Sequence, residues 1–124
     1  GDVAQTLDFS EEIPWQTFSE ERVEALAGRT VFIDFTADWC LSCKANEKTI
    51  LSTDTVRQAM AEHEVVPLMA DFTKPDPVIQ RWLDRYEKAG VPMYLVIPAD
   101  RSQPVQVLPE VLTIGTVVDA LKAG

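Results

Sequence analysis

The sequence predicts one α/β domain with a central mixed β-sheet and helices on both faces of that sheet. Buried strand-like runs alternate with amphipathic segments through most of the chain, and two strand-like runs near the end have no helix between them. The first pattern is typical of parallel strands joined by helices, and the second predicts an antiparallel hairpin. With 124 residues, 46% apolar and 25% charged, the chain is long enough for one hydrophobic core. We expect residues 1–13 to be an irregular N-terminal extension and residues 14–124 to form the domain.

The N-terminal extension is acidic, and we expect its first half to be loosely ordered. Phe9 and Ile13 are its expected points of attachment to the core. Residues 15–18 are predicted to form a short edge strand, where a preceding proline is tolerated. Ser19 is a suitable N-cap for the helix that follows, and Gly28 is typical of the position just past a helix end.

A nearly continuous run of β-forming apolar residues over 31–35 predicts a strand that is covered on both faces, with Asp34 as its one interruption. A helix is predicted to follow it and to break near Asp54. Asp54 is expected to cap a second helical piece over residues 55–62. Residues 65–72 are the next predicted buried strand.

The C-terminal part begins with Asp76, which is expected to cap a helix that has proline at its first position and ends at Gly90. Residues 94–97 are predicted to form a strand, with residues 104–108 as its hairpin partner, and Thr113 is expected to cap a last amphipathic helix. The helix after Asp76 has a core-facing stripe with helical spacing, made of Ile79, Trp82, Leu83 and Tyr86.

The charge of the chain argues against nucleic acid as a partner. Its formal net charge is −9 and its pI is near 4.4, whereas binding to a phosphate backbone depends on clustered Lys and Arg. No apolar run approaches the length of a membrane-spanning helix, and the first residues lack the basic start and apolar core of a signal peptide. We therefore expect a soluble, monomeric domain, either a complete mature chain or an excised piece of a longer one.

Cys40 and Cys43 are the two cysteines of the chain, and only two residues separate them. A bridge across so short a loop gains little from loop closure, so a reversible dithiol is favoured over a structural disulfide. The alternatives are two small buried apolar residues or half of a metal site. A tetrahedral zinc site usually takes four ligands, and His63 is the one histidine available.

The position of the pair predicts the role of each cysteine. Cys40 stands at the predicted start of a helix, where unpaired N–H groups and the helix dipole favour a thiolate. Cys43 lies about one turn later on the same face. We therefore expect Cys40 to attack a partner disulfide and Cys43 to resolve the mixed disulfide.

The segment DFTADWCLSCK, which spans residues 34–44, resembles the active-site segment of the thioredoxin family, and the segment Gly90-Val91-Pro92 is similar to the one that carries the cis-proline of that fold. The motif from Ala37 to Lys48 is more similar still to the C-terminal domains of the DsbD family of thiol:disulfide interchange proteins. The resemblance extends from about residue 15 to residue 121. Two departures from it are Glu110, where a glycine usually precedes the last helix, and the inter-cysteine pair.

This resemblance implies a thioredoxin fold and a periplasmic domain of an inner-membrane protein, covalently linked to a transmembrane domain that donates electrons. It also implies that the domain passes those electrons to other thiol:disulfide exchange domains or proteins, in processes such as cytochrome c biogenesis. A redox-active Cys40–Cys43 disulfide would be the working group, with no bound cofactor and no metal.

The inter-cysteine pair, Leu41-Ser42, offers no histidine to stabilise a Cys40 thiolate. A poorly stabilised thiolate makes a dithiol a better reductant, so this pair favours an electron donor over an oxidase. The alternative is that these two positions accept almost any residue.

Asp34 and Glu47 are the candidates for proton control. Asp34 lies six residues before Cys40 in an apolar strand, and Glu47 lies four residues after Cys43 on the same helix face. Carboxylates there would raise the pKa values of the cysteines and accept a proton from Cys43 during resolution. The resemblance implies the same role, because both positions are associated with active-site proton control in the similar family. The alternatives are a strand-end cap for Asp34 and a solvated helix face for Glu47.

Pro92 is the third component of the predicted site. X-Pro bonds are usually trans, but the resemblance implies a cis bond that leaves the Val91 backbone free to pair with an extended partner. Trp39 is expected to serve packing, with shielding of the adjacent thiol as a second possible role.

The sequence thus predicts a thiol:disulfide oxidoreductase domain that relays electrons as a reductant. One alternative is a freestanding thioredoxin-like reductase or isomerase. Two others come from different functional classes, namely a Cu(I)-binding metallochaperone module, since thiolates are soft ligands, and a redox-inactive interaction domain.

Overall fold

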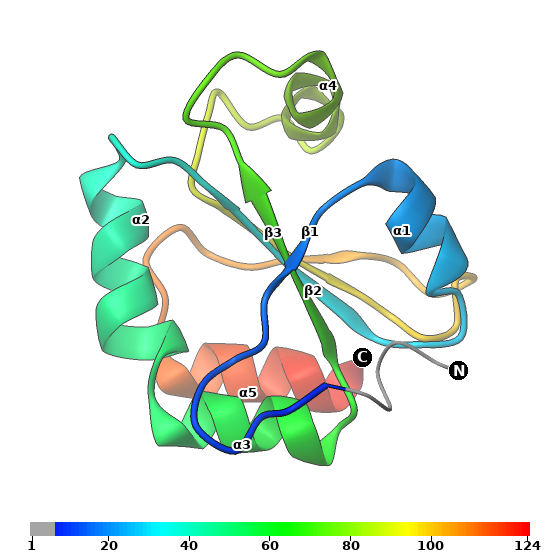
Figure 1. Cartoon of the computed structure of the whole chain (residues 1–124). Helices are drawn as coiled ribbons and strands as arrows, with labels where there is room; N and C mark the ends of the chain where they lie inside the picture. Colours follow the sequence, from blue (N-terminus) through cyan, green and yellow to red (C-terminus); the bar gives the residue numbers. More distant parts are fainter. Residues whose placement is uncertain (1–6) are drawn as a thin grey trace.

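The computed structural model describes residues 7–124, which form a five-stranded mixed sheet with the strand order β1-β3-β2-β4-β5 (Figure 1). Strands β1, β3 and β2 run parallel, β4 is antiparallel to β2, and β5 closes an antiparallel hairpin with β4. The strands are β1 (Gln16–Thr17), β2 (Val31–Thr36), β3 (Val66–Asp71), β4 (Met93–Ile97) and β5 (Gln106–Val107). The predicted α/β architecture, with its parallel first part and terminal hairpin, is confirmed.

Helices cover both faces of the sheet. α1 and α4 lie on one side of the strands, and α2, α3 and α5 lie on the other (Figure 1). The helices are α1 (Glu20–Ala25), α2 (Leu41–Asn46), α3 (Asp54–Glu62), α4 (Pro77–Arg85) and α5 (Ile114–Ala123). A π-helical turn, η2 (Glu47–Leu51), continues α2 directly.

The alternation of side chains along β2 creates two separate cores, one on each face. The odd-numbered residues 31–35 belong to the core under α1 and α4. Phe32 belongs to the core under α3 and α5, and the period of two places Asp34 and Thr36 on that same face. All six residues of β2 are buried, which is why Asp34 stands in the interior.

The predicted caps at Ser19, Asp76 and Thr113 are confirmed, because each side-chain oxygen accepts a backbone N–H of the first helical turn. The cap of α3 is Thr53 rather than Asp54. The Thr53 hydroxyl accepts the amide of Val56 and donates to the preceding turn, so it satisfies both helix ends at this junction.

The end of α4 differs from the prediction. The helix ends at Arg85, five residues before Gly90, and Glu87 takes the left-handed conformation with φ of 59°. The amide of Lys88 donates to the Leu83 carbonyl at 2.9 Å, and the amide of Glu87 donates to Asp84 at 3.0 Å. These two bonds form a Schellman motif, with a glutamate where glycine is usual.

The N-terminal extension packs against the face that carries α3. Ile13 is buried in the core there, and Phe9 packs against it, as predicted. Figure 1 shows this blue segment crossing over α3 and the lower end of the α2 region before it reaches β1. The expected looseness of the first half falls largely on residues 1–6, outside the described residues. Within residues 7–124, no helix is both long enough and apolar enough to cross a bilayer.

Candidate active site

The two cysteines lie where β2 passes into α2. After Thr36 the chain turns through Ala37, and Cys40 is the N-cap of α2, with its sulfur accepting the amide of Cys43 at 3.2 Å. The two residues form a disulfide, with their Cα atoms 5.2 Å apart. Cys40 is 6% exposed and Cys43 is completely buried. A partner can therefore reach Cys40 first, which supports the predicted order of attack and resolution.

The hydroxyl of Ser42 lies 3.5 Å from the Cys40 sulfur. In the disulfide state the sulfur has no proton to donate, so Ser42 is the donor of this contact. The sequence shows that the inter-cysteine pair lacks a cation, but it does not show that the pair supplies a neutral donor to the sulfur. That contact depends on the first turn of α2.

Asp34 is a fully buried carboxyl group on the face of β2 that α2 covers. Its neighbours across the sheet are Met69 on β3 and Tyr94 on β4. Among the described residues, no N–H or hydroxyl group donates to either carboxylate oxygen of Asp34, and the group within hydrogen-bonding reach is the carboxyl of Glu47. A buried charge without a donor is costly, so the site favours the protonated form of this group.

Glu47 is the polar group that faces Asp34 across the core. Burial is the main cause that raises the pKa of Asp34 well above its usual range, and the Glu47 carboxyl adds to it, while Lys44 opposes it. The two carboxyl groups can share a hydrogen bond only while one of them holds a proton. The structure therefore brings the two predicted acidic residues together as a pair that favours binding of one proton.

The Glu47 carboxylate has one oxygen near solvent and one oxygen inside. Oε1 accepts from Lys44 Nζ at 3.2 Å, and the same ammonium group lies 3.8 Å from Asp38. Oε2 is buried and has no hydrogen-bond partner among the described residues. The Glu47 side chain is thus partly buried, and it connects the buried Asp34 to the surface charges of Lys44 and Asp38.

The Val91–Pro92 peptide bond is cis, as the resemblance implied. Val91 packs against Ala37, Cys40 and Cys43, so the loop before β4 lies directly beside the disulfide. None of the backbone hydrogen bonds found in residues 7–124 outside the regular elements involves Val91. Its backbone is therefore available to an extended partner segment next to Cys40.

Trp39 lies at the surface next to Cys40 and remains 60% exposed. Its indole nitrogen donates to the Thr73 carbonyl at 3.1 Å, and the Thr73 hydroxyl accepts the amide of Asp38 at 2.9 Å. Thr73 is in turn held by Asp71. This loop after β3 fixes the turn before Cys40, and no local sequence signal pointed to Thr73.

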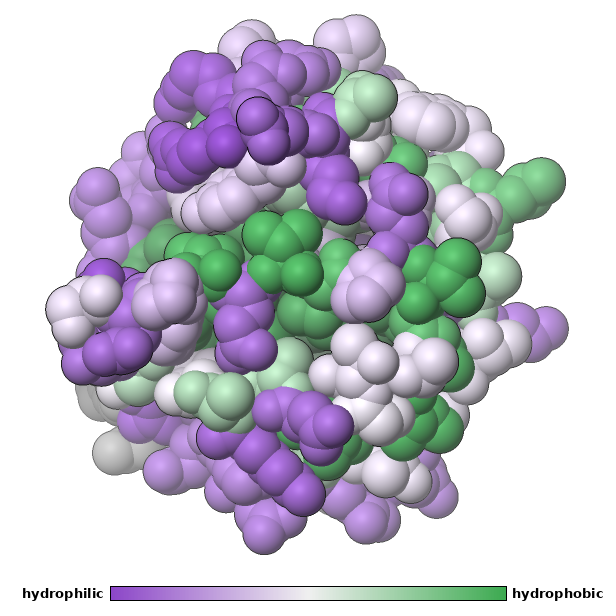
Figure 2. Space-filling model, turned by 180° about the vertical axis from the view of Figure 1, so that it is seen from behind, coloured by the Kyte–Doolittle hydropathy of each residue, from purple (hydrophilic) through white to green (hydrophobic). Residues whose placement is uncertain are grey.

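The exposed apolar surface includes the start of α2 and the β5 side of the molecule. Figure 2, which views the molecule from behind Figure 1, shows apolar side chains across the middle of that face, with polar ones above and below. The exposed large apolar residues in the described part of the chain are Trp39, Leu41, Val107 and Val111. Two of these flank Cys40 in sequence, so the disulfide lies beside apolar surface that a partner can cover.

Asn46 is a further site residue that the sequence did not reveal. Its Nδ2 donates to the Tyr94 hydroxyl at 2.9 Å and to the Glu110 carbonyl at 2.7 Å, and its Oδ1 accepts the amide of Leu112 at 3.3 Å. The side chain thereby ties α2 to the loop before α5, which contains Glu110. Burial raises the pKa of Tyr94, so the phenol stays neutral beside Asp34.

Replacement of Asn46 by alanine is expected to lower the free energy of unfolding by about 2 kcal/mol, because it leaves the Leu112 amide and the Tyr94 hydroxyl without this partner. Urea denaturation measures the change. Lys48→Ala on the exposed side of the same helical segment is the matched control and is expected to change stability by less than about 0.5 kcal/mol. An Asn46→Ala protein as stable as the control would show that these bonds do not hold α2.

The other groups near the site do not assemble into a metal centre. Among residues 7–124, no group of three or more His, Cys, Asp or Glu side chains is placed to hold a metal ion.

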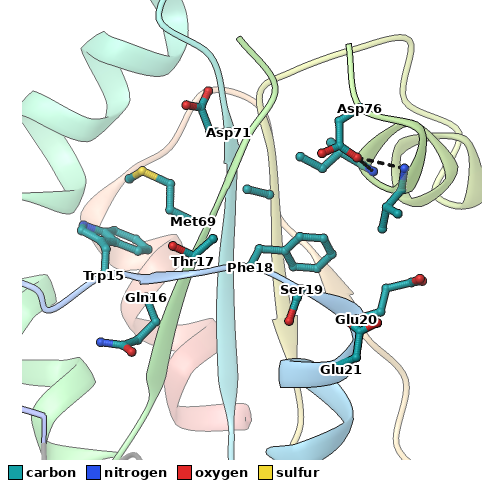
Figure 3. Close-up of a pocket in the computed structure, with 13 residues that line it drawn as sticks. Trp15, Gln16, Thr17, Phe18, Ser19, Glu20, Glu21, Met69, Asp71 and Asp76 are labelled. Carbon is teal, nitrogen blue, oxygen red and sulfur yellow. Dashed lines mark hydrogen bonds between the residues drawn. The ribbon is translucent and has the colours of Figure 1, made fainter. Parts of the chain in front are cut away.

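A cavity of about 610 Å³ lies at the β1 edge, between the start of α1 and the start of α4. Figure 3 shows Trp15 and Met69 at one end of it and Asp76 at the other. Neither cysteine lines it, so the candidate site is the disulfide and the residues behind it.

Comparison with known proteins supports this assignment. A protein-family model described as Thioredoxin-like matches residues 14–99. The thiol:disulfide interchange protein DsbD of Ralstonia nicotianae is 38% identical over 88 residues, which cover 70% of this chain and 14% of that protein. DsbD 1 of Pseudomonas aeruginosa is 38% identical over 69 residues, which cover 56% of this chain and 11% of that protein. The chain thus spans only a small part of the length of these relatives.

Solved structures share the fold. The C-terminal domain of Neisseria meningitidis DsbD in the oxidised form matches with a TM-score of 0.65 and 22% identity, covering 87% of this chain and 98% of that one. A thioredoxin from Thermus thermophilus matches with a TM-score of 0.64 and 21% identity, covering 88% of this chain and 84% of that one. These matches confirm the predicted thioredoxin fold. Because the family model spans more than half of a chain whose paired cysteines stand at the β2–α2 junction, the chain belongs to the thioredoxin-like family.

Proposed function

We propose that this chain is a thiol:disulfide oxidoreductase domain that acts as a reductant. The observation that carries the proposal is the Cys40–Cys43 disulfide at the start of α2, with one sulfur accessible and the other buried. Such a pair supports dithiol–disulfide exchange without a bound cofactor, because the two sulfur atoms themselves hold the two electrons.

The reaction proceeds in two exchanges. The Cys40 thiolate attacks a disulfide of the partner, so a Cys40–partner bond forms and one partner thiolate leaves. Cys43 then loses its proton and attacks Cys40, which forms the intramolecular disulfide and releases the second partner thiolate. The domain is oxidised by two electrons and the partner is reduced by two. The partner thiolates take up protons from solvent.

The surroundings of the cysteines favour donation of electrons over oxidation of partners. No cation lies between the two cysteines in the sequence, and the Asp34–Glu47 pair lies behind them. Both features disfavour a thiolate, and a dithiol whose thiolate is poorly stabilised gives up its electrons more readily. The Ser42 hydroxyl acts in the opposite direction, but a neutral donor is weaker than a charge.

The proposal also covers the location of the domain and its link to other domains. The similar DsbD proteins are several times longer than this chain. A periplasmic location, a covalent link to a membrane-embedded donor domain and transfer to periplasmic partner proteins follow if the chain is a piece of such a protein. The exposed apolar surface beside Cys40 and the unpaired Val91 backbone fit docking of such partners.

Trapping of the mixed disulfide tests this proposal. The Cys43→Ser variant lacks the resolving thiol and is expected to accumulate as a covalent adduct through Cys40 with its partners. The adducts are separated on non-reducing gels and identified by mass spectrometry. We expect one membrane donor and a small number of periplasmic partners, released by added reductant.

Cys40→Ser is the matched control and is expected to trap nothing, because Cys43 is buried. A broad set of secreted proteins on Cys43→Ser would instead favour a freestanding isomerase. No adduct with any thiol protein would contradict the exchange function. Tight Cu(I) binding by the reduced wild-type domain would favour the metallochaperone alternative.

A further inference from the structure

The loop before α5 continues the surface at which a partner meets the disulfide. β5 pairs with β4 in an antiparallel register, and the Leu108 amide extends that register toward the cysteines by donating to the Tyr94 carbonyl at 3.0 Å. Followed three residues further, the same register brings Val111 level with Val91. Val91 packs against Cys40, so the loop lies one strand position away from the segment that contacts the reactive sulfur.

Hydrogen bonds to α2 hold this loop on both sides of Val111. The Glu110 carbonyl accepts from Asn46 Nδ2 at 2.7 Å, and the Leu112 amide donates to Asn46 Oδ1 at 3.3 Å. Figure 1 shows the orange loop that leads into α5 beside α2. Leu112 is buried, whereas Val111 is 80% exposed. The loop is thus anchored, and it presents an apolar side chain to solvent from a fixed backbone.

The start of α2 supplies the other side of the same apolar surface. Leu41, directly after Cys40, is 85% exposed. Leu41 and Val111 are the two most exposed large apolar side chains in the described part of the chain, and the Val91 segment lies between them in the order of the strands. An extended segment that pairs with the Val91 backbone can therefore cover both side chains, which removes apolar surface from water.

Glu110 adds a carboxylate to this surface. Its side chain is exposed, and none of the ion pairs or side-chain hydrogen bonds found in residues 7–124 involves its carboxylate. The bond from its carbonyl to Asn46 fixes the point from which the side chain extends. Glu110 therefore presents an unpaired negative charge next to Val111, across the Val91 segment from Cys40.

The charges around the surface leave it negative. At the start of α2, Lys44 lies 3.8 Å from Asp38 and 3.2 Å from Glu47, so one ammonium group faces two carboxylates. Glu110 adds a third carboxylate, and the whole chain has a formal net charge of −9. A partner segment with positive charge is therefore attracted to this surface, and an acidic segment is repelled.

We propose that Glu110 determines which partners the domain accepts, by pairing with a lysine or arginine close to the partner's reactive cysteine. The inference rests on the proposed function and names its substrate class, an extended segment that carries an apolar and a basic side chain beside a disulfide. Residues of an extended segment advance about 3.3 Å each, so the basic residue is expected within about three positions of the attacked cysteine. Glu110 contacts the partner and takes no part in the transfer of electrons.

Reduction of synthetic peptide disulfides by the reduced domain tests this proposal. Each peptide has one cysteine in an extended apolar segment, with lysine, glutamine or glutamate two residues away, and is used as its disulfide-linked dimer. One reaction converts the Cys40 and Cys43 thiols to a disulfide and the peptide dimer to two thiols. Acid quenching and mass spectrometry give the rate constants. The wild type is expected to reduce the lysine peptide about tenfold faster than the glutamate peptide, because attraction replaces repulsion.

Variants at one position separate the charge of Glu110 from the charge of the whole chain. Glu110→Lys is expected to abolish or reverse the preference, and Glu110→Asp to retain most of it. Glu62→Lys, at an exposed position of α3, changes the net charge equally and is the matched control. Its ratio should stay within about twofold of wild type. A wild-type ratio near one, a ratio that persists in Glu110→Lys, or an equal change in Glu62→Lys would overturn the proposal.

Binding without reaction keeps this inference distinct from the proposed function. The same peptides with serine in place of cysteine are titrated into the oxidised domain, and NMR follows the amide signals of Val91 and Val111. The dissociation constant of the lysine peptide is expected to be about tenfold lower than that of the glutamate peptide. If the peptides are reduced and bound equally well, the role of Glu110 is wrong and the proposed function stands. If the wild type reduces no disulfide at all, the proposed function fails, and the binding ratio still decides whether Glu110 selects a basic segment.

Discussion

Replacement of Asp34 by asparagine is expected to raise the free energy of unfolding of the oxidised protein by about 2 kcal/mol at about pH 8. The native carboxyl group is fully buried and lacks a hydrogen-bond donor among the described residues, and its neighbour across the core is another carboxylate. An asparagine of nearly the same shape removes the charge and offers two N–H groups toward Glu47. Urea denaturation of the two proteins at several pH values measures the difference.

The sign of the pH dependence follows from the raised pKa of Asp34. A group that binds its proton more tightly in the folded state contributes stability below its unfolded pKa of about 3.9 and loses that contribution as the pH rises through the folded-state value. The advantage of Asp34→Asn should therefore be small at about pH 4 and grow toward about pH 8. Asp38→Asn, at an exposed side chain, is the control. A variant that is less stable than wild type at the higher pH would contradict the account of Asp34.

Removal of both acidic residues is expected to have the second large effect. In Asp34→Asn with Glu47→Gln, the thiolate titration of reduced Cys40 should move to lower pH and the thiolate fraction at neutral pH should rise several-fold, because two carboxyl groups behind the disulfide no longer oppose a negative charge. Ultraviolet absorbance of the thiolate during a pH titration measures this. The same variant should resolve mixed disulfides more slowly, because the proton acceptor for Cys43 is gone.

The two single variants show whether the pair acts as a unit. If Asp34 and Glu47 share one proton, the single changes should not add up to the effect of the double change. Asp119→Asn with Glu62→Gln changes the net charge equally at exposed positions of α5 and α3 and serves as the control. A thiolate titration that is the same in the double variant and the wild type would disprove proton control by these residues.

Local sequence patterns were sufficient to predict the elements of the fold and the centre of the site. The apolar run around Asp34 predicted β2, and the position of Cys40 after it predicted the helix start that the structure shows. The same patterns identified Asp34 and Glu47, because one interrupts a buried strand and the other repeats at the helical period after Cys43. Whether Glu47 faced solvent or the core could not be decided from that period alone.

The residues that the sequence missed act through contacts between distant segments. Asn46 joins α2 to the loop before α5, and Thr73 joins the loop after β3 to the turn before Cys40. Arg57 likewise joins α3 to the N-terminal extension, because its Nη1 donates to the Glu11 carbonyl. No local period or spacing carries such information.

The errors at element boundaries occur where neighbouring residues could cap or end a helix with similar free energies. Thr53 and Asp54 are both good N-caps, and the hydroxyl of Thr53 prevails because it also donates to the end of η2. Glu87 takes the position usually occupied by glycine because two backbone bonds close the Schellman motif there. The sequence analysis predicted that the helix ends at Gly90, whereas α4 ends at Arg85.

The redox equilibrium of the domain with glutathione tests the central claim most directly. The domain is equilibrated with defined mixtures of reduced and oxidised glutathione and then quenched with acid. Its free thiols are alkylated, and mass spectrometry counts the alkyl groups. We expect a two-electron transition of the Cys40–Cys43 pair at a reduction potential close to that of thioredoxin, about −270 mV. A potential near the strongly oxidising value of about −120 mV, or a disulfide that does not exchange with glutathione at all, would contradict a reductant built on this pair.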